Sequence, residues 1–164
     1  MFSLYNNKIY SFFQCFLISI ILIFIQAYMP KIWLFTEFDI SVDLFLIFLT
    51  LLLLNNQIHL VILYAFFLGL FQDFVVQVDM IGSYALIKPF TVYFLGILKS
   101  FSHQWSNLNK MFYLLVIYLL HFLIYYYIMV NSSLFVIFIL SIIQSLVCLF
   151  LFYIFEKLIY NSNI

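Results

Sequence analysis

The sequence predicts an all-α integral membrane protein that folds as one domain, 1–164, into a single bundle of about six transmembrane helices. Of its 164 residues, 68% are apolar and only 7% are charged, and the mean hydropathy is +1.24. A soluble domain carries about a quarter charged residues, so this chain cannot cover a water-facing surface. Unbroken apolar runs such as 51–54 and 134–140 favour helices over a barrel, because barrel strands alternate polar and apolar residues.

Each expected span is an apolar run that ends at polar or helix-breaking residues, and about 20 such residues cross a bilayer. The first run stops at Pro30 and is as long as a true span, so we expect a retained helix rather than a signal peptide. The second run ends at the polar triplet 55–57, which the third follows directly. The fifth begins after Lys110, and the sixth follows the polar segment 131–133. The expected spans are 9–29, 38–54, 58–76, 83–98, 111–130 and 134–155.

The lysines predict the orientation of these spans. With six spans, Lys8, Lys99, Lys110 and Lys157 fall on one side, and only Lys31 falls in a loop on the other. Because loops rich in Lys and Arg stay in the cytoplasm, both termini are expected there. A five-span arrangement would place Lys8 and Lys157 on opposite sides and agrees less well with this rule.

Several chemistries have no candidate residues. The chain has no Arg, and six Lys balance six acidic residues, so no basic patch for nucleic acid is expected. Cys15 and Cys148 have no Cys or His at ligand spacing, and we interpret them as small helix residues rather than a disulfide or metal site. The three histidines are scattered, and neither a phosphate-binding loop nor a nucleophile elbow is present. We therefore expect a protein that is not an enzyme and uses no cofactor or metal.

Small and polar residues recur at helical spacing and predict helix–helix contacts. Ala65 and Gly69 lead along one helical face to Asp73, and small residues on such a face let backbones approach closely. Polar residues on a face of the sixth span are expected to bond neighbouring helices. The candidate packing residues are Ala65, Gly69, Gly96, Ser141, Gln144 and Ser145.

Asp73 and Lys88 are ionisable residues within expected spans. A charge at the centre of a span costs about 2.5–3.5 kcal/mol on insertion scales, so such residues are functional candidates. Both are expected near the outer ends of adjacent helices, where a mutual ion pair would lower this cost. Two interpretations stay open, namely a structural pair and a contact with a partner or ligand.

The order of features resembles a known family. The segment GLFQD at 69–73 places an acid near the end of the third span, and Gly82 follows nine residues later at the start of the fourth. With a length near 160 and six spans, this resembles MreD, the rod-shape-determining membrane protein of bacteria. The pair Lys88-Pro89 departs from that pattern.

The resemblance implies a non-enzymatic subunit of the elongasome in the bacterial cytoplasmic membrane. Such a protein supports cell shape and lateral peptidoglycan synthesis through contacts with other proteins. The implied partners are an MreC-like protein, a RodA-like glycosyltransferase and a penicillin-binding transpeptidase, together with membrane lipid. MreD-like folds also look like the substrate-binding components of energy-coupling-factor transporters, which leaves vitamin capture as the alternative. The sparse polar residues favour protein contacts over solute capture.

The orientation can be tested with reporter proteins fused after Asn55, Gln77, Asn107 and Ser132. These four fusions should report inside, outside, inside and outside, because the lysines place both termini in the cytoplasm. Paired reporters active only in the cytoplasm or only outside it provide the measurement. Two or more reversed signals would reject the six-span topology.

Overall fold

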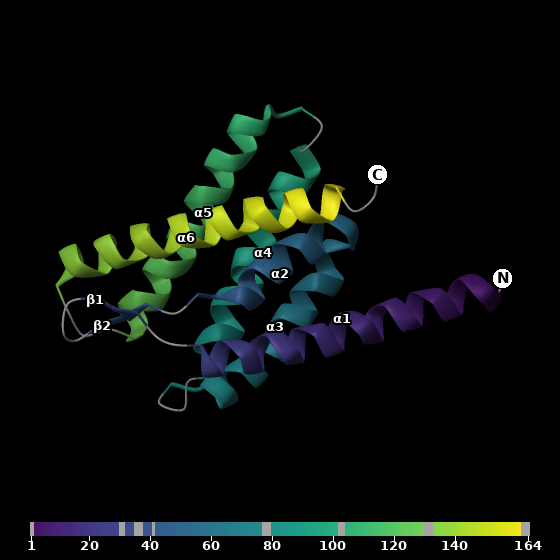
Figure 1. Cartoon of the computed structure of the whole chain (residues 1–164), viewed down its shortest axis with the longest axis horizontal. Coiled ribbons are helices and arrows are strands. Elements are labelled where there is room, and N and C mark those ends of the chain that lie inside the picture. Colours follow the sequence, from purple (N-terminus) through teal and green to yellow (C-terminus); the bar gives the residue numbers. More distant parts are fainter. Residues whose placement is uncertain are drawn as a thin grey trace.

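The computed structural model describes residues 2–29, 32–34, 38–40, 42–76, 80–101, 104–129 and 133–161, with side chains described in 14–29, 42–76, 80–101, 104–129 and 133–158. Lys31, expected on the outer side, lies outside the described residues, and so does the side chain of Lys8. The elements in order are α1 (Phe2–Tyr28), β1 (Ile32–Leu34), β2 (Phe38–Ile40), α2 (Leu44–Asn55), α3 (Ile58–Val76), α4 (Ser83–Phe101), α5 (Asn107–Met129) and α6 (Leu134–Asn161), shown in Figure 1.

The predicted helical architecture with six helices is confirmed. Three helical segments of the described chain are long and apolar enough to cross a membrane: Ile58–Val76, Asn107–Met129 and Leu134–Leu158. Helix α3 has the predicted bounds, and α6 begins at the predicted residue. Helix α5 begins four residues earlier than expected, because Ser106 lies before it and accepts hydrogen bonds from Asn109 N at 3.4 Å and Lys110 N at 3.1 Å.

The predicted second span, 38–54, is partly wrong. Its first residues form β2, which pairs antiparallel with β1, and the helix begins only at Leu44. Asp43 determines this start, because its Oδ1 accepts a hydrogen bond from Leu46 N at 2.9 Å. Helix α2 has 12 residues and is therefore about 18 Å long, which is shorter than the hydrocarbon core of a bilayer.

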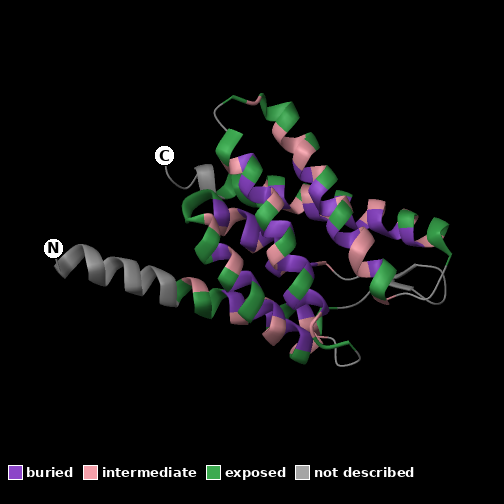
Figure 2. Cartoon of the chain, turned by 180° about the vertical axis from the view of Figure 1, so that it is seen from behind, coloured by how far each residue is buried: buried purple, intermediate pink, exposed green. Residues whose placement is uncertain are grey.

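Helix α2 is the centre of the bundle. It contacts α1, α3, α4 and α6, and Phe45, Leu46 and Leu49 on it are completely buried. Figure 2 shows buried residues on the facing sides of the helices and exposed residues on their outer sides. The start of α1 and the end of α6 lie on the same side of the molecule (Figure 1).

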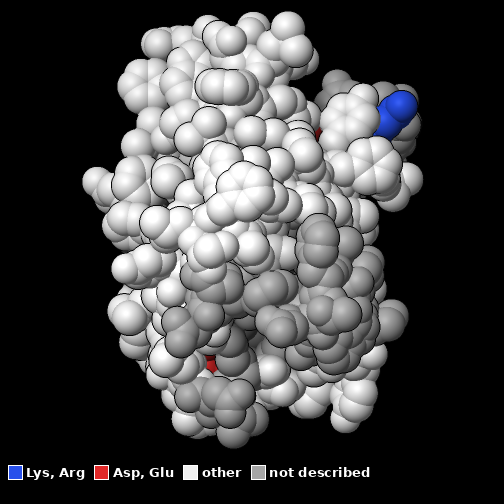
Figure 3. All heavy atoms as spheres, turned by 90° about the vertical axis from the view of Figure 1, so that its left-hand side faces the viewer, with Lys and Arg blue, Asp and Glu red and all other residues white. Residues whose placement is uncertain are grey.

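The outer surface carries large apolar side chains. Phe67 is 65% exposed, Leu86 72% and Phe150 64%. Figure 3 shows a face on which nearly all described atoms belong to uncharged residues. Extended apolar surface of this kind is typical of proteins that contact lipid or other proteins.

Helices α3 and α4 approach each other most closely at Gly69. A Cβ atom on Gly69 would lie 2.9 Å from Tyr84 O and 3.0 Å from Ala85 Cα, which are backbone atoms. A Cβ atom on Gly96 would instead overlap the Cδ1 atom of Ile58, the flexible end of a side chain. The two predicted packing glycines therefore differ in how much space they preserve.

We expect Gly69→Ala to lower the free energy of unfolding by about 1–3 kcal/mol, because the backbones of α3 and α4 must move apart. Gly96→Ala is the matched control and should cost less, since the Ile58 side chain can rotate away. Unfolding of both variants in mixed detergent micelles gives the comparison. Equal losses would contradict the close backbone approach at Gly69.

Candidate functional site

An ionic cluster lies inside the bundle at the start of α2. Asp43 caps this helix with Oδ1, and only 2% of the residue is exposed. Lys88 extends from α4 and its Nζ donates to both carboxylate oxygens of Asp43 at 2.7 Å. Lys88 is completely buried, so each charge is stabilised mainly by the other.

Aromatic rings surround the remaining side of the Lys88 ammonium. Its Nζ lies 4.7 Å from the ring centroid of Phe45 and 4.9 Å from that of Tyr84. Cations are attracted to the negative faces of such rings, and more strongly where water is excluded. The ammonium group therefore has a carboxylate and two ring faces in place of water.

His121 on α5 is the third member of the cluster. Its Nε2 lies 3.8 Å from Asp43 Oδ2, and its Nδ1 lies 2.7 Å from Thr91 Oγ1. Thr91 Oγ1 also lies 2.8 Å from Ile87 O, to which it donates. A hydroxyl has one proton, so in this arrangement His121 Nδ1 donates to Thr91. Nε2 then faces the Asp43 carboxylate with a lone pair when the ring is neutral, and with an N–H group when it is charged.

The cluster joins the start of α2 to the interior of α4 and α5. Lys88 lies about 7.5 Å along α4 from its first residue, and His121 lies about 12 Å before the last residue of α5. Nε2 of His121 is buried and has no hydrogen-bond partner among the described residues. The arrangement can hold α2, α4 and α5 together, and it offers one nitrogen that can accept a proton.

The predicted pair of Asp73 with Lys88 is wrong. Asp73 is completely buried, and its carboxylate accepts hydrogen bonds at the start of α4 from Gly82 N, Ser83 Oγ, Tyr84 N and Ala85 N, at 3.0–3.1 Å. The first N–H groups of a helix have no partner within it, so a carboxylate there is favourable. Lys88 lies farther along α4 and pairs with Asp43.

Sequence reasoning missed Asp43 because it placed this residue within an apolar span. An acid directly before an apolar run is typical of a helix N-cap, and Asp43 precedes Leu44 in this way. With that signal, the second helix would have been predicted to begin at Leu44. Asp43 would then have been a third candidate charged residue beside Asp73 and Lys88.

The polar residues predicted on α6 are all buried, but they do not act alike. Ser141 Oγ donates to Ile137 O at 2.7 Å, and Ser145 Oγ donates to Ile142 O at 2.9 Å, both within α6. Gln144 accepts a hydrogen bond from Tyr126 of α5 and thereby connects two helices. Ala65, which is completely buried, and Gly69 lie on α3, which packs against α4.

Tyrosine hydroxyls make two further contacts between helices that the sequence did not reveal. Ser19 Oγ lies 2.8 Å from Tyr64 Oη and joins α1 to α3. Thr50 Oγ1 lies 3.1 Å from Tyr118 Oη and joins α2 to α5. No group of three or more His, Cys, Asp or Glu side chains that could hold a metal occurs in the part of the chain that the structure describes.

Comparison of the chain with protein-family models, with curated proteins and with solved structures finds no match. A functional interpretation therefore depends on the residues and contacts described above.

The ion pair can be tested by a double-mutant cycle of Asp43→Asn and Lys88→Met. Each single change should lower the free energy of unfolding by about 3–5 kcal/mol, because it leaves an uncompensated buried charge. Asn can still cap α2, so Asp43→Asn isolates the loss of charge. The double variant should lose less than the sum of the two single changes, as measured by unfolding in mixed micelles.

The matched control combines Asp73→Asn with Lys88→Met. Because these residues have separate hydrogen-bond partners, their effects should add within about 0.5 kcal/mol. Strong coupling in this control, or additive losses for Asp43 and Lys88, would contradict the observed pairing.

Proposed function

We propose that this chain is an MreD-type protein, a non-enzymatic subunit of the bacterial cell-elongation complex. It crosses the cytoplasmic membrane six times with both termini in the cytoplasm. It supports cell shape and lateral peptidoglycan synthesis by binding an MreC-like protein, a RodA-like glycosyltransferase and a penicillin-binding transpeptidase.

The observation that supports this proposal is the close contact between α3 and the start of α4. Gly69, Asp73 and Gly82, the residues on which the resemblance depends, all belong to it. Gly69 lies against the α4 backbone, and Asp73 accepts hydrogen bonds from the first N–H groups of that helix. Gly82 has a φ of 106°, which side-chain-bearing residues rarely adopt, and donates its N–H to Asp73. These three residues together shape the contact between α3 and α4, so they support the resemblance more strongly than three unrelated matching positions would.

The distribution of polar groups supports a role in protein contacts. Asp43, Asp73 and Lys88 are buried and bound to other groups of the chain, so they are not available to a substrate at the surface. The outward faces of the helices are rich in Phe, Leu and Tyr. Such faces can pack against lipid or against the membrane helices of a partner.

The six-span topology agrees with two features of the fold. The first helix begins and the last helix ends on the same side of the molecule (Figure 1), which an even number of crossings requires. The second feature is the burial of α2, which at 12 residues is too short to cross a bilayer alone but contacts α1, α3, α4 and α6 inside the bundle. A short helix is tolerated at membrane depth where other protein segments surround it.

Depletion of the protein in its rod-shaped host should produce round or swollen cells, because lateral wall synthesis would lose a subunit. Microscopy of cell shape together with co-purification of an MreC-like protein provides the measurement. Gly69→Leu, which closes the space between α3 and α4, should fail to restore rod shape. Gly96→Ala, whose added Cβ atom would meet only the flexible side chain of Ile58, is the control and should restore it.

Normal rods after full depletion would contradict the proposal. If the purified protein then also bound a vitamin tightly, the chain would instead be the substrate-binding component of an energy-coupling-factor transporter.

A further inference from the structure

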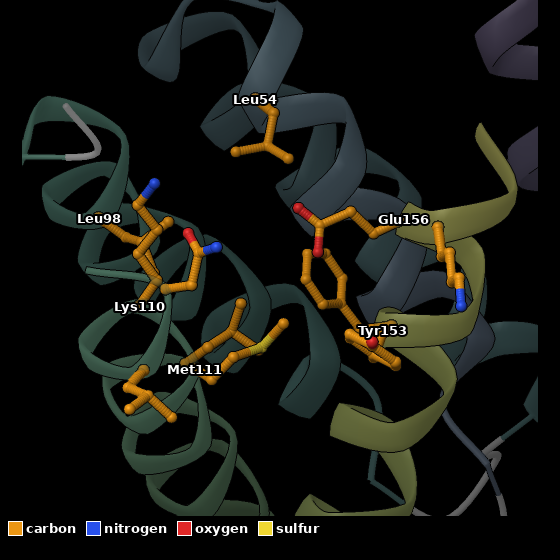
Figure 4. A pocket seen from close by; sticks show the side chains of 11 residues that line it. Leu54, Leu98, Lys110, Met111, Tyr153 and Glu156 are labelled. Atoms are coloured by element: carbon orange, nitrogen blue, oxygen red, sulfur yellow. The ribbon is translucent and has the colours of Figure 1, made fainter. Parts of the chain in front are cut away.

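A pocket of about 550 Å³ opens at the ends of α2, α4, α5 and α6. Figure 4 shows Lys110 and Met111 on α5 facing Tyr153 and Glu156 on α6, with Leu54 of α2 at its edge. These helix ends lie on the side where Lys99, Lys110 and Lys157 are expected, which is the cytoplasmic side of the proposed topology. The walls are apolar and include Leu98, Met111, Leu114 and Phe152.

Charged side chains are rare in this chain, and several of the described ones line this pocket. The described side chains include seven Asp, Glu and Lys residues. Asp43, Asp73 and Lys88 are bound in the interior, and Lys99 donates to Leu53 O at 2.9 Å and to Asn56 O at the end of α2. The remaining three, Lys110, Glu156 and Lys157, all line the pocket, and none of their side chains forms a hydrogen bond or ion pair with another described residue.

The pocket carries Lys110 on its α5 wall, and both Glu156 and Lys157 on its α6 wall. Helix α5 begins there at Asn107, so its first N–H groups and Lys110 make this wall attractive to an anion. On the opposite wall, Glu156 extends from α6 toward the pocket (Figure 4). A ligand that suits both walls carries a phosphate and an ammonium group a few bonds apart.

We propose that this pocket binds the headgroup of phosphatidylethanolamine from the inner leaflet of the membrane. The phosphate lies near the start of α5 and Lys110, and the ammonium group donates to Glu156. Phosphatidylglycerol lacks the cation that Glu156 would bind, and phosphatidylcholine lacks an N–H donor. The inference depends on membrane insertion and orientation but not on the role in cell elongation.

The surroundings of the pocket favour a lipid over a water-soluble phosphate. Leu108 lines it and is 82% exposed, and Phe112, one turn farther along α5, is 71% exposed. Leu158, next to Lys157 on α6, is 61% exposed. These side chains can contact acyl chains while the headgroup occupies the charged pocket, and basic pockets between membrane helices at the cytoplasmic face are known to bind phospholipid headgroups.

Native mass spectrometry of the purified full-length protein in detergent tests this site. Phosphatidylethanolamine, phosphatidylcholine and phosphatidylglycerol with identical acyl chains are titrated separately. The first should bind about tenfold more tightly than the other two, as expected for one charge-assisted hydrogen bond. Equal affinities for the three lipids would overturn the proposal. So would displacement of the lipid by water-soluble glycerophosphoethanolamine at the same concentration, since this would assign the site to a soluble ligand.

Substitutions of the lining residues test which side chains recognise the headgroup. Glu156→Gln should abolish the preference for phosphatidylethanolamine over phosphatidylcholine, and Lys110→Gln should weaken binding of all three lipids. Glu156→Lys should reverse the preference toward phosphatidylglycerol, a gain that an unfolded variant cannot produce. His59→Gln is the control. His59 is an exposed residue at the start of α3, directly after the end of α2, and it does not line the pocket. An unchanged preference in Glu156→Gln or Glu156→Lys would overturn the assignment.

Discussion

The ion pair between Lys88 and Asp43 is the interaction on which the arrangement of the central helices depends. Both groups are removed from water, and a buried charge without a partner is costly, so the position of each residue constrains the other. Asp43 is also the N-cap of α2, and therefore the pair fixes the point at which α2 begins beside α4. His121 extends the same constraint to α5 through its position beside Asp43 and its bond to Thr91.

A related rule explains the positions of Asp73, which is buried, and Lys99, which is partly buried. Helix ends carry N–H or C=O groups without partners, and in an apolar bundle these must be bound by side chains. Asp73 binds the N–H groups at the start of α4, and Lys99 binds the carbonyl groups at the end of α2. Helix α2 is thus capped by an acid at its start and by a base at its end. The start of this short helix can therefore be buried in the bundle, while its last residues are exposed.

The sequence predicted what depends on long apolar runs and failed where a single residue decides. Six helices follow from runs such as that of α3, whose length and polar borders leave little choice. The hairpin and the late start of α2 did not follow, because Phe38 and Ile40 are as apolar as a membrane helix. Periodicity also cannot show which charges meet, since partners such as Asp43 and Lys88 are 45 residues apart. Interhelical bonds of tyrosine were hidden for a similar reason, because Tyr is counted among the apolar residues.

Glycine is scarce in this chain, and the helices therefore contact one another in different ways in the core and beside the pocket. The chain has three glycines, and a close approach of two helix backbones occurs at Gly69, where α3 meets α4. Elsewhere larger contacts hold the helices, such as the bond from Tyr126 of α5 to Gln144 of α6. This bond lies near the end of α5, whereas the start of α5 diverges from α6 (Figure 1). The side chains of Lys110 and Glu156 line the pocket at these divergent helix ends, and neither bonds another side chain in the part of the chain that the structure describes.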